Sequence, residues 1–397
     1  MSNSTDTTQP SVRSAALPIV SKWPLLWPML LVIVVPLIVS WFVYPETHLP
    51  PKFGVFPPVL VEPFPAFWLP YFLLVLAAVL VIAAFLIWPT RFGFQPPQPQ
   101  PPRPLPVAFP AWFWAGAMLT VVFLAIMFGR ALPWAYYAFS PLWWGFILVL
   151  DGLVYRRNAG RSLLSRKPKT LFISALVSVV GWGFFEYYDY FALGDWYYPN
   201  GAMPALSHAT IVALFLIAYT TVWPALLEWY TLLQTFPTLA ARYAVGPKLV
   251  LPSNLLIWGG LALCGALVVW PLPLFWVLWI GPMAVLMGLL QRLKIWTPIA
   301  ALAEGNWTPA VLVALGSLFN GLFWEVWNWG SAHPDPSFAT NPNYWVYNIP
   351  YVNVIHLFAE MPLLGFAGYL PFGILVWLVF IWAGQLCGFS TSLDLDD

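Results

Sequence analysis

The sequence GWGFFEYYDY at residues 181–190 recurs in altered form as NGLFWEVWNW at residues 320–329. Both stretches lie within apolar segments long enough to cross a membrane, and in register Glu186 matches Glu325. A charged side chain at the centre of a membrane costs roughly 2.5–3.5 kcal/mol on insertion scales, so such a residue usually has a function. The repeated stretch therefore predicts an α-helical membrane protein with an internal repeat, and it predicts where the functional site lies.

The similarity between the two copies continues beyond the glutamates. Asp189 matches Asn328, and each copy then reaches an aromatic turn, at residues 196–198 and 345–347. Residues three apart share a helix face, so each acidic or amide pair points the same way. Both copies run in the same direction, which predicts a parallel repeat. We expect the two faces to meet at a shared cavity, where repulsion between the glutamates would keep a proton on one of them.

The composition excludes a soluble protein. Hydrophobic residues make up 61% of the chain, charged residues 8%, and the mean hydropathy is +0.77. Apolar runs of about 20 residues are typical of transmembrane helices. We predict ten spans, the last of them long and broken, at roughly 24–44, 66–88, 111–131, 134–155, 171–191, 207–232, 254–270, 273–291, 309–329 and 352–387.

The distribution of charge predicts the orientation. If the N-terminus is inside, all of the 16 basic residues except Lys52 and Arg130 lie on the inner side. This asymmetry is what the positive-inside rule expects. The sequence thus predicts a multi-pass protein of the cytoplasmic (inner) membrane with both termini in the cytoplasm. The net charge of +1 gives no reason to expect nucleic acid as a partner.

The same reading divides the chain into five regions. They are a disordered cytoplasmic tail (1–23), a four-helix N-terminal membrane region (24–155) with a proline-rich connector (95–106), a basic cytoplasmic loop (156–170), a four-helix region with the first repeat in spans five and six (171–294), and a region with the second repeat in spans nine and ten, the broken last helix and a short acidic tail (295–397).

Tryptophans are unusually frequent, and most of the 26 lie near span ends, as in an aromatic belt at the membrane surface. Five of them lie beside the buried carboxylates or in the aromatic turns, where they could line a pocket for a flat apolar ligand or a cation. We predict that these five bind substrate: Trp182, Trp196, Trp324, Trp327 and Trp345. Asn328 is predicted to bind substrate as well, and Glu186, Glu325 and Asp189 are the predicted catalytic residues.

A second polar cluster occurs in the last predicted span. Asn353, His356 and Glu360 have the spacing of a single helical stripe, and Pro362 follows directly. Proline breaks a helix, and broken helices at membrane depth often frame binding sites. The stripe is therefore predicted to bind substrate. The sequence predicts neither a bound metal nor a cofactor.

One repeat resembles a known group of membrane proteins. Asp189, the turn at residues 194–198, and Pro224 followed by Glu228 resemble the heterodimer-type lycopene cyclases and related carotenoid-modifying proteins. The paired glutamates of that family are absent, since Glu228 stands alone. The resemblance implies acid catalysis on an isoprenoid chain, without a redox cofactor, by a buried carboxylic acid. The whole chain also resembles tryptophan-rich polytopic bacterial membrane proteins of uncharacterised function.

Three functions follow from these features. The first is an intramembrane enzyme that acts on a lipid or isoprenoid by carboxylate acid/base chemistry. The second is a proton- or ion-coupled transporter that uses the same carboxylates. The third is a non-catalytic subunit or assembly factor of a larger membrane complex. The expected partners are membrane lipids, an isoprenoid or pigment, and, for the third function, other membrane subunits.

Overall fold

The computed structural model describes residues 21–98, 105–332 and 340–396, so most of the predicted tail (1–23) and part of the proline-rich connector (95–106) lie outside the described residues. The described chain consists of helices and a single two-stranded ribbon. The longer helices are α1 (Trp23–Val43), α2 (Leu69–Ile87), α3 (Ala111–Phe128), α4 (Phe139–Arg157), α6 (Pro168–Phe191), α7 (His208–Tyr219), α8 (Val222–Gln234), α10 (Ser253–Val269), α12 (Val277–Arg292), α13 (Thr308–Ala332) and α14 (Tyr369–Cys387). The short elements are η1 (Pro89–Phe92), η2 (Trp134–Tyr137), α5 (Leu163–Arg166), β1 (Trp196–Tyr197), α9 (Pro237–Ala241), α11 (Pro271–Leu274), η3 (Ala300–Glu304), β2 (Val346–Tyr347) and η5 (Leu363–Gly368).

Seven helical stretches among the described residues are long and apolar enough to cross a membrane. They are α1, α2, α3, α6, α7 with α8, α13, and η5 with α14. The shorter helices α10 and α12 are also apolar. The prediction of an α-helical, multi-pass membrane protein is therefore confirmed.

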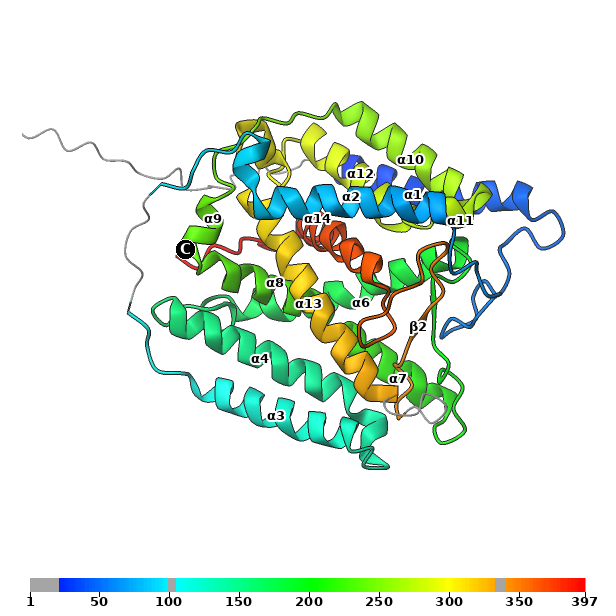
Figure 1. The fold of residues 1–397 in the computed structure, drawn as a ribbon, viewed down its shortest axis with the longest axis horizontal. Helices are drawn as coiled ribbons and strands as arrows, with labels where there is room; N and C mark the ends of the chain where they lie inside the picture. Colours follow the sequence, from blue (N-terminus) through cyan, green and yellow to red (C-terminus); the bar gives the residue numbers. More distant parts are fainter. Residues whose placement is uncertain (1–20, 99–104, 333–339, 397) are drawn as a thin grey trace, which may run out of the picture.

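The helices form a central group flanked on two sides (Figure 1). Helices α6, α8, α13 and α14 lie at the centre and pack against one another. The hairpin of α3 and α4 packs against α13 and α8 on one side, and α1, α10 and α12 pack together on the other, next to α14. Both helices that carry the repeated stretches, α6 and α13, thus belong to the centre of the bundle.

Glycines allow the flanking helices to approach closely. A Cβ atom on Gly116 of α3 would lie 2.7 Å from the carbonyl oxygen of Gly145 in α4. In the same way, a Cβ atom on Gly260 of α10 would lie 2.8 Å from the carbonyl oxygen of Gly281 in α12. Small residues at such crossings are typical of membrane helices, where packing replaces the hydrophobic effect between helices.

The two aromatic turns meet in the ribbon. Strands β1 and β2 pair antiparallel, with Trp196 opposite Tyr347 and Tyr197 opposite Val346. β2 lies at one end of the bundle, and α9 and the C-terminus lie at the other (Figure 1). The ribbon therefore ties the loop that follows α6 to the loop that follows α13.

The last predicted span is helical only from Leu363 onward, so the prediction of a helical stripe is wrong. Residues 353–362 have no regular helix, η5 begins at Leu363, and α14 begins at Tyr369. Pro362 lacks an amide hydrogen and disfavours helical backbone in the residue before it. Asn353, His356 and Glu360 consequently lie in a loop and share no helix face.

Candidate functional site

A cavity of about 570 Å³ lies at the ribbon end of the bundle. Aromatic and aliphatic side chains from α2, α4, α6, α7, α8, α12, α13, η5, α14 and the loops around the ribbon form its wall. The size and the apolar wall are typical of pockets for small organic ligands. Its aromatic lining includes Trp182, Trp196, Tyr198, Tyr219, Trp276, Trp279, Trp324, Trp345, Tyr347, Tyr369 and Phe372.

Glu186 of α6 is buried behind this wall and accepts four hydrogen bonds. The indole of Trp182 (2.8 Å) and the hydroxyls of Tyr198 (2.6 Å) and Tyr219 (2.9 Å) donate to Oε1. The indole of Trp196 donates to Oε2 (3.3 Å). All four donors line the cavity. Hydrogen bonds to a charged group are the stronger kind, so this shell offsets much of the cost of burying the carboxylate.

Glu325 of α13 has a thinner shell. The hydroxyls of Tyr347 and Tyr369, both in the cavity wall, donate to Oε1 at 2.8 Å each. The other oxygen, Oε2, is buried and finds no hydrogen-bond partner among the described residues. The amide of Met361 is the backbone donor close to this carboxyl group. One oxygen of Glu325 is therefore fixed, while the other is left for a proton or a ligand.

Each repeated stretch contributes a tryptophan to the cavity wall, whereas Glu186, Asp189, Glu325 and Asn328 are not among the lining residues. The rings of Trp182 and Trp324 lie 5.7 Å apart, and both line it. Glu186 and Glu325 form no hydrogen bond with each other, and each is enclosed by its own set of donors. The two carboxylates are therefore connected to the same cavity by their hydrogen-bond donors, which line it.

A break between α7 and α8 places Tyr219. Pro224 has no amide hydrogen to donate to the preceding turn, and the helix is interrupted after Tyr219. Ser178 of α6 bridges this break, because its hydroxyl donates to the carbonyl of Tyr219 and accepts from the amide of Trp223 (3.1 Å).

Gly321 makes room for the matching tyrosine of the second copy. A Cβ atom there would lie 2.3 Å from the ring of Tyr369, so only glycine lets this ring pass along α13 to reach Glu325. Each carboxylate thus depends on a tyrosine that enters from a neighbouring helix.

Asp189 and Asn328 hold the aromatic turns. Oδ1 of Asp189 accepts from the amides of Asp195 (2.8 Å) and Trp196 (3.4 Å). Oδ1 of Asn328 accepts from the amide of Trp345 (3.0 Å), and its Nδ2 donates to the carbonyl of the same residue (2.8 Å). The residues that match in sequence therefore bind backbone at matching positions.

We expect Asp189→Asn to leave stability almost unchanged, because Asn328 already does the same task with an amide. Asp189→Ala should lower the free energy of unfolding by about 2–4 kcal/mol, since two buried backbone amides lose their acceptor. Thermal unfolding of both variants in the same detergent measures the difference. Equal loss of stability in both would contradict this role.

The remaining predicted aromatic residues divide into two groups. Trp196 and Trp345 line the cavity together with Trp182 and Trp324. Trp327 lies elsewhere, with its ring 6.1 Å from that of Trp143 in α4. It belongs to the packing between α13 and α4.

The three residues of the second polar cluster do not line the cavity. Asn353 donates to the carbonyl of Tyr347 (3.1 Å), and the exposed His356 lies 3.2 Å from Asn353. Glu360 accepts from the hydroxyl of Tyr344 (2.7 Å). These contacts fold the loop that precedes η5. No three His, Cys, Asp or Glu side chains of the described residues form a group that could hold a metal.

Sequence reasoning missed Asp195 as a site residue. Its side chain is 3% exposed, it lines the cavity, and neither carboxylate oxygen has a hydrogen-bond partner in the part of the chain that the structure describes. The missed signal is an acidic residue inside an otherwise aromatic turn. At the matching position the second copy carries Tyr344.

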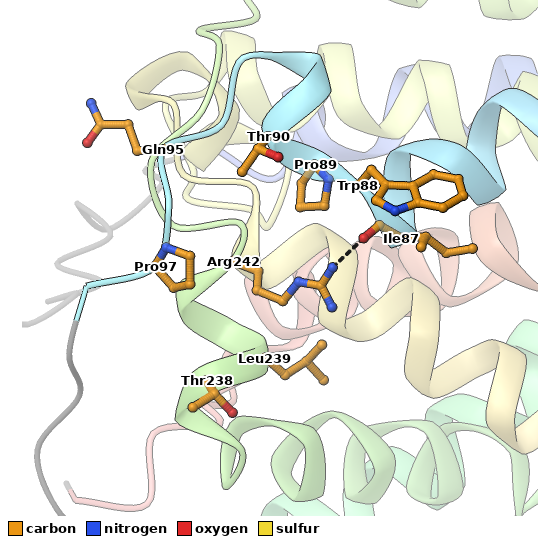
Figure 2. Close-up of a pocket in the computed structure, with 9 residues that line it drawn as sticks. All are labelled: Ile87, Trp88, Pro89, Thr90, Gln95, Pro97, Thr238, Leu239 and Arg242. Atoms are coloured by element: carbon orange, nitrogen blue, oxygen red, sulfur yellow. Dashed lines mark hydrogen bonds between the residues drawn. The ribbon is translucent and has the colours of Figure 1, made fainter.

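A second cavity, of about 470 Å³, lies between the end of α2 and α9 (Figure 2). Arg242 points into it and donates to the carbonyl of Ile87. Trp88, Thr238 and Leu239 are among its other lining residues. None of the predicted site residues lines it.

No protein-family model, curated protein or solved structure matches this chain.

Proposed function

We propose that this protein is an intramembrane enzyme that acts on an isoprenoid or lipid by acid catalysis with a carboxyl group. The observation that carries the proposal is the buried, unpartnered Oε2 of Glu325 behind the wall of an aromatic cavity. A general acid needs a proton on a group that faces the reacting atoms, and burial in an apolar site favours the protonated form.

In the proposed reaction, Glu325 donates the proton on Oε2 to a carbon–carbon double bond. The O–H bond breaks, a C–H bond forms, and the neighbouring carbon becomes positively charged. Loss of a proton from an adjacent carbon back to the carboxylate gives an isomerised or cyclised product of unchanged composition. No electrons are gained or lost, so the step needs no oxidant or reductant.

The cavity suits such a reaction. The faces of Trp182 and Trp324 can stabilise a positive carbon by cation–π attraction. The hydroxyls of Tyr347 and Tyr369 stay bound to Oε1 and stabilise the carboxylate that forms when the proton leaves. Glu186 provides a fixed carboxylate behind the same wall. The apolar wall also excludes the water that would otherwise capture the cation.

The packing of α8 favours an enzyme over a carrier. Val222 lines the cavity, whereas Trp223, Leu226 and Leu227 on the following turns are fully buried in the core. A carrier opens its site towards both sides of the membrane, so it would have to move these buried side chains, whereas an enzyme would not. For the subunit function we find no specific support.

We also propose that the chain crosses the cytoplasmic membrane ten times with both termini inside. Seven of the ten predicted spans match the seven long apolar helical stretches, and α4, α10 and α12 coincide with the other three. The basic connections on either side of α5 lie at the same end as α9 and the C-terminus (Figure 1).

The ribbon supports the proposed internal repeat. Tyr197 and Val346 match in the repeat and also pair with each other, while Trp196 pairs with Tyr347. Such pairing is what a two-fold axis between the two strands would produce. The repeat would then place Glu186 and Glu325 in equivalent positions around the cavity.

The resemblance to carotenoid-modifying proteins implies the same chemistry, acid catalysis by a buried carboxyl group. Some of the residues that carry the resemblance also belong to the site. The turn at residues 194–198 supplies wall residues of the cavity, and Asp189 holds that turn. Glu228 lies in α8 and is buried, and its partner Thr231 does not line the cavity, whereas both donors to Glu325 do. We therefore assign the acid to Glu325 and propose an isoprenoid as the substrate class.

Hydrogen isotope exchange tests the proposal. Membranes that contain the protein are incubated in D₂O with the lipid extract of its own host, and the lipids are analysed by mass spectrometry. We expect one isoprenoid or lipid to gain deuterium with the wild-type protein and none to do so with Glu325→Gln. Absence of protein-dependent deuterium in every lipid class would contradict acid catalysis on a carbon chain.

A further inference from the structure

The backbone of Asp195 is anchored on both sides. Its amide donates to Asp189 (2.8 Å), and its carbonyl accepts from the amide of Asn348 (2.7 Å). The residue therefore has a fixed place between the two aromatic turns. Its carboxyl group nevertheless has no partner within residues 21–98, 105–332 and 340–396, although it is 3% exposed. A buried polar group without a partner costs about 1–3 kcal/mol, which a ligand could recover.

The cavity wall around Asp195 is largely apolar, and it reaches the membrane at α2. Leu74, Val75 and Ile82 of α2 are among its lining residues. Leu74 is also 68% exposed, and no residue of α2, which is described in full, is buried. The helix thus stands between the cavity and the surrounding lipid, so a ligand with a long apolar chain can come from the bilayer.

We propose that the cavity binds a long-chain amphiphile with a terminal hydroxyl group, such as an isoprenoid alcohol, with the hydroxyl on the Asp195 carboxyl and the chain along the aromatic wall. The reaction that the bound molecule undergoes rests on the proposed function. The binding itself is separate, because it uses Asp195 and not Glu325.

The electrostatics of the loop favour a hydroxyl over an ammonium group. Asp195 lies between α6 and α7, outside the membrane-spanning helices, and burial raises the pKa of its carboxyl well above the ordinary value. The neutral acid is therefore favoured. A neutral carboxyl can donate to and accept from one hydroxyl at once, whereas an ammonium group would need the carboxylate.

Competition between two probes tests the inference. The purified full-length protein is offered an equimolar mixture of geranylgeraniol, a C20 isoprenoid alcohol, and the matching C20 hydrocarbon in which hydrogen replaces the hydroxyl. Native mass spectrometry then measures the ratio of the two bound species. We expect the wild-type protein to bind the alcohol about tenfold more tightly than the hydrocarbon. This ratio corresponds to a difference in binding free energy of about 1.4 kcal/mol.

Two variants of the same residue separate hydrogen bonding from shape. Asp195→Leu should remove the preference for the alcohol, while Asp195→Asn, which can still donate and accept, should keep it within about threefold of the wild type. Glu325→Gln should keep the preference in full even though it stops deuterium incorporation, so failure of the reaction and failure of the binding site are distinguishable.

Several outcomes would overturn the inference. Equal binding of alcohol and hydrocarbon by the wild-type protein would do so without any variant, even if Asp195→Leu does not fold. An unchanged preference in a folded Asp195→Leu protein would place the hydroxyl elsewhere. A stronger preference for geranylgeranylamine that Asp195→Asn abolishes would show that the site takes a cation.

Discussion

Glu325→Gln is expected to lower turnover by about 100- to 10,000-fold, the usual contribution of a general acid. Glutamine has the same shape, and its carbonyl oxygen can still accept from Tyr347 and Tyr369, which hold Oε1 of the glutamate. Its amide cannot give up a proton to a double bond. The rate of deuterium incorporation from D₂O measures the loss, and thermal unfolding shows whether the fold is kept.

A matched control for this variant is Glu228→Gln. Glu228 is also a fully buried glutamate, but its hydrogen-bond partner Thr231 does not line the cavity, whereas both donors to Glu325 do. The same chemical change at this position should leave deuterium incorporation within about twofold of the wild type. If both variants lose activity equally, the loss reflects damage to the bundle. If Glu325→Gln retains full activity, another group is the acid.

Glu186→Leu is expected to have the largest effect on stability. Four donors, two indoles and two hydroxyls, lose their common acceptor in the interior of the bundle. Each buried donor left without a partner costs about 1–3 kcal/mol, so the total loss should exceed about 4 kcal/mol. We expect little folded protein after detergent extraction, as measured by size-exclusion chromatography with fluorescence detection.

Glu186→Gln provides the comparison at the same position. Its carbonyl oxygen can replace Oε1, which accepts three of the four hydrogen bonds, so only the contact of Trp196 with Oε2 is lost. We expect a folded protein with a loss of about 1–3 kcal/mol. A Glu186→Leu protein as stable as the wild type would mean that the four hydrogen bonds contribute nothing to the fold.

The sequence was sufficient to predict the helices and part of the site for a physical reason. Long apolar runs have few alternatives to a transmembrane helix. A glutamate inside such a run is costly, which draws attention to Glu186 and Glu325. Trp182 shares a helix face with Glu186, Trp324 directly precedes Glu325 in the sequence, and the structure places both tryptophans in the cavity wall.

The residues that sequence reasoning missed do not place a charge inside a long apolar run. Asp195 lies in a loop, where an acidic residue carries no apparent cost, and its burial follows from the packing of the ribbon over it. Tyr219 and Tyr369 reach the glutamates from other helices, across a distance in sequence that no local pattern encodes.

The polar cluster in the last span shows the opposite case, a pattern that predicts a helix face where no helix forms. The spacing of Asn353, His356 and Glu360 fits a helix, but the backbone there is not helical. A periodic pattern describes a face only where a helix exists. Here the residues fold a loop, and Pro362 marks the point after which helical structure can begin.

The ribbon also has a consequence for the biosynthesis of the protein. Tyr197 leaves the ribosome long before Val346, so β1 and β2 cannot pair until the second strand has been translated. While the second half is still being translated, β1 lacks its pairing strand, and the cavity lacks the wall residues that come from α13, η5 and α14. The cavity and the hydrogen bonds to Glu325 can therefore be completed only when the last helices have been made.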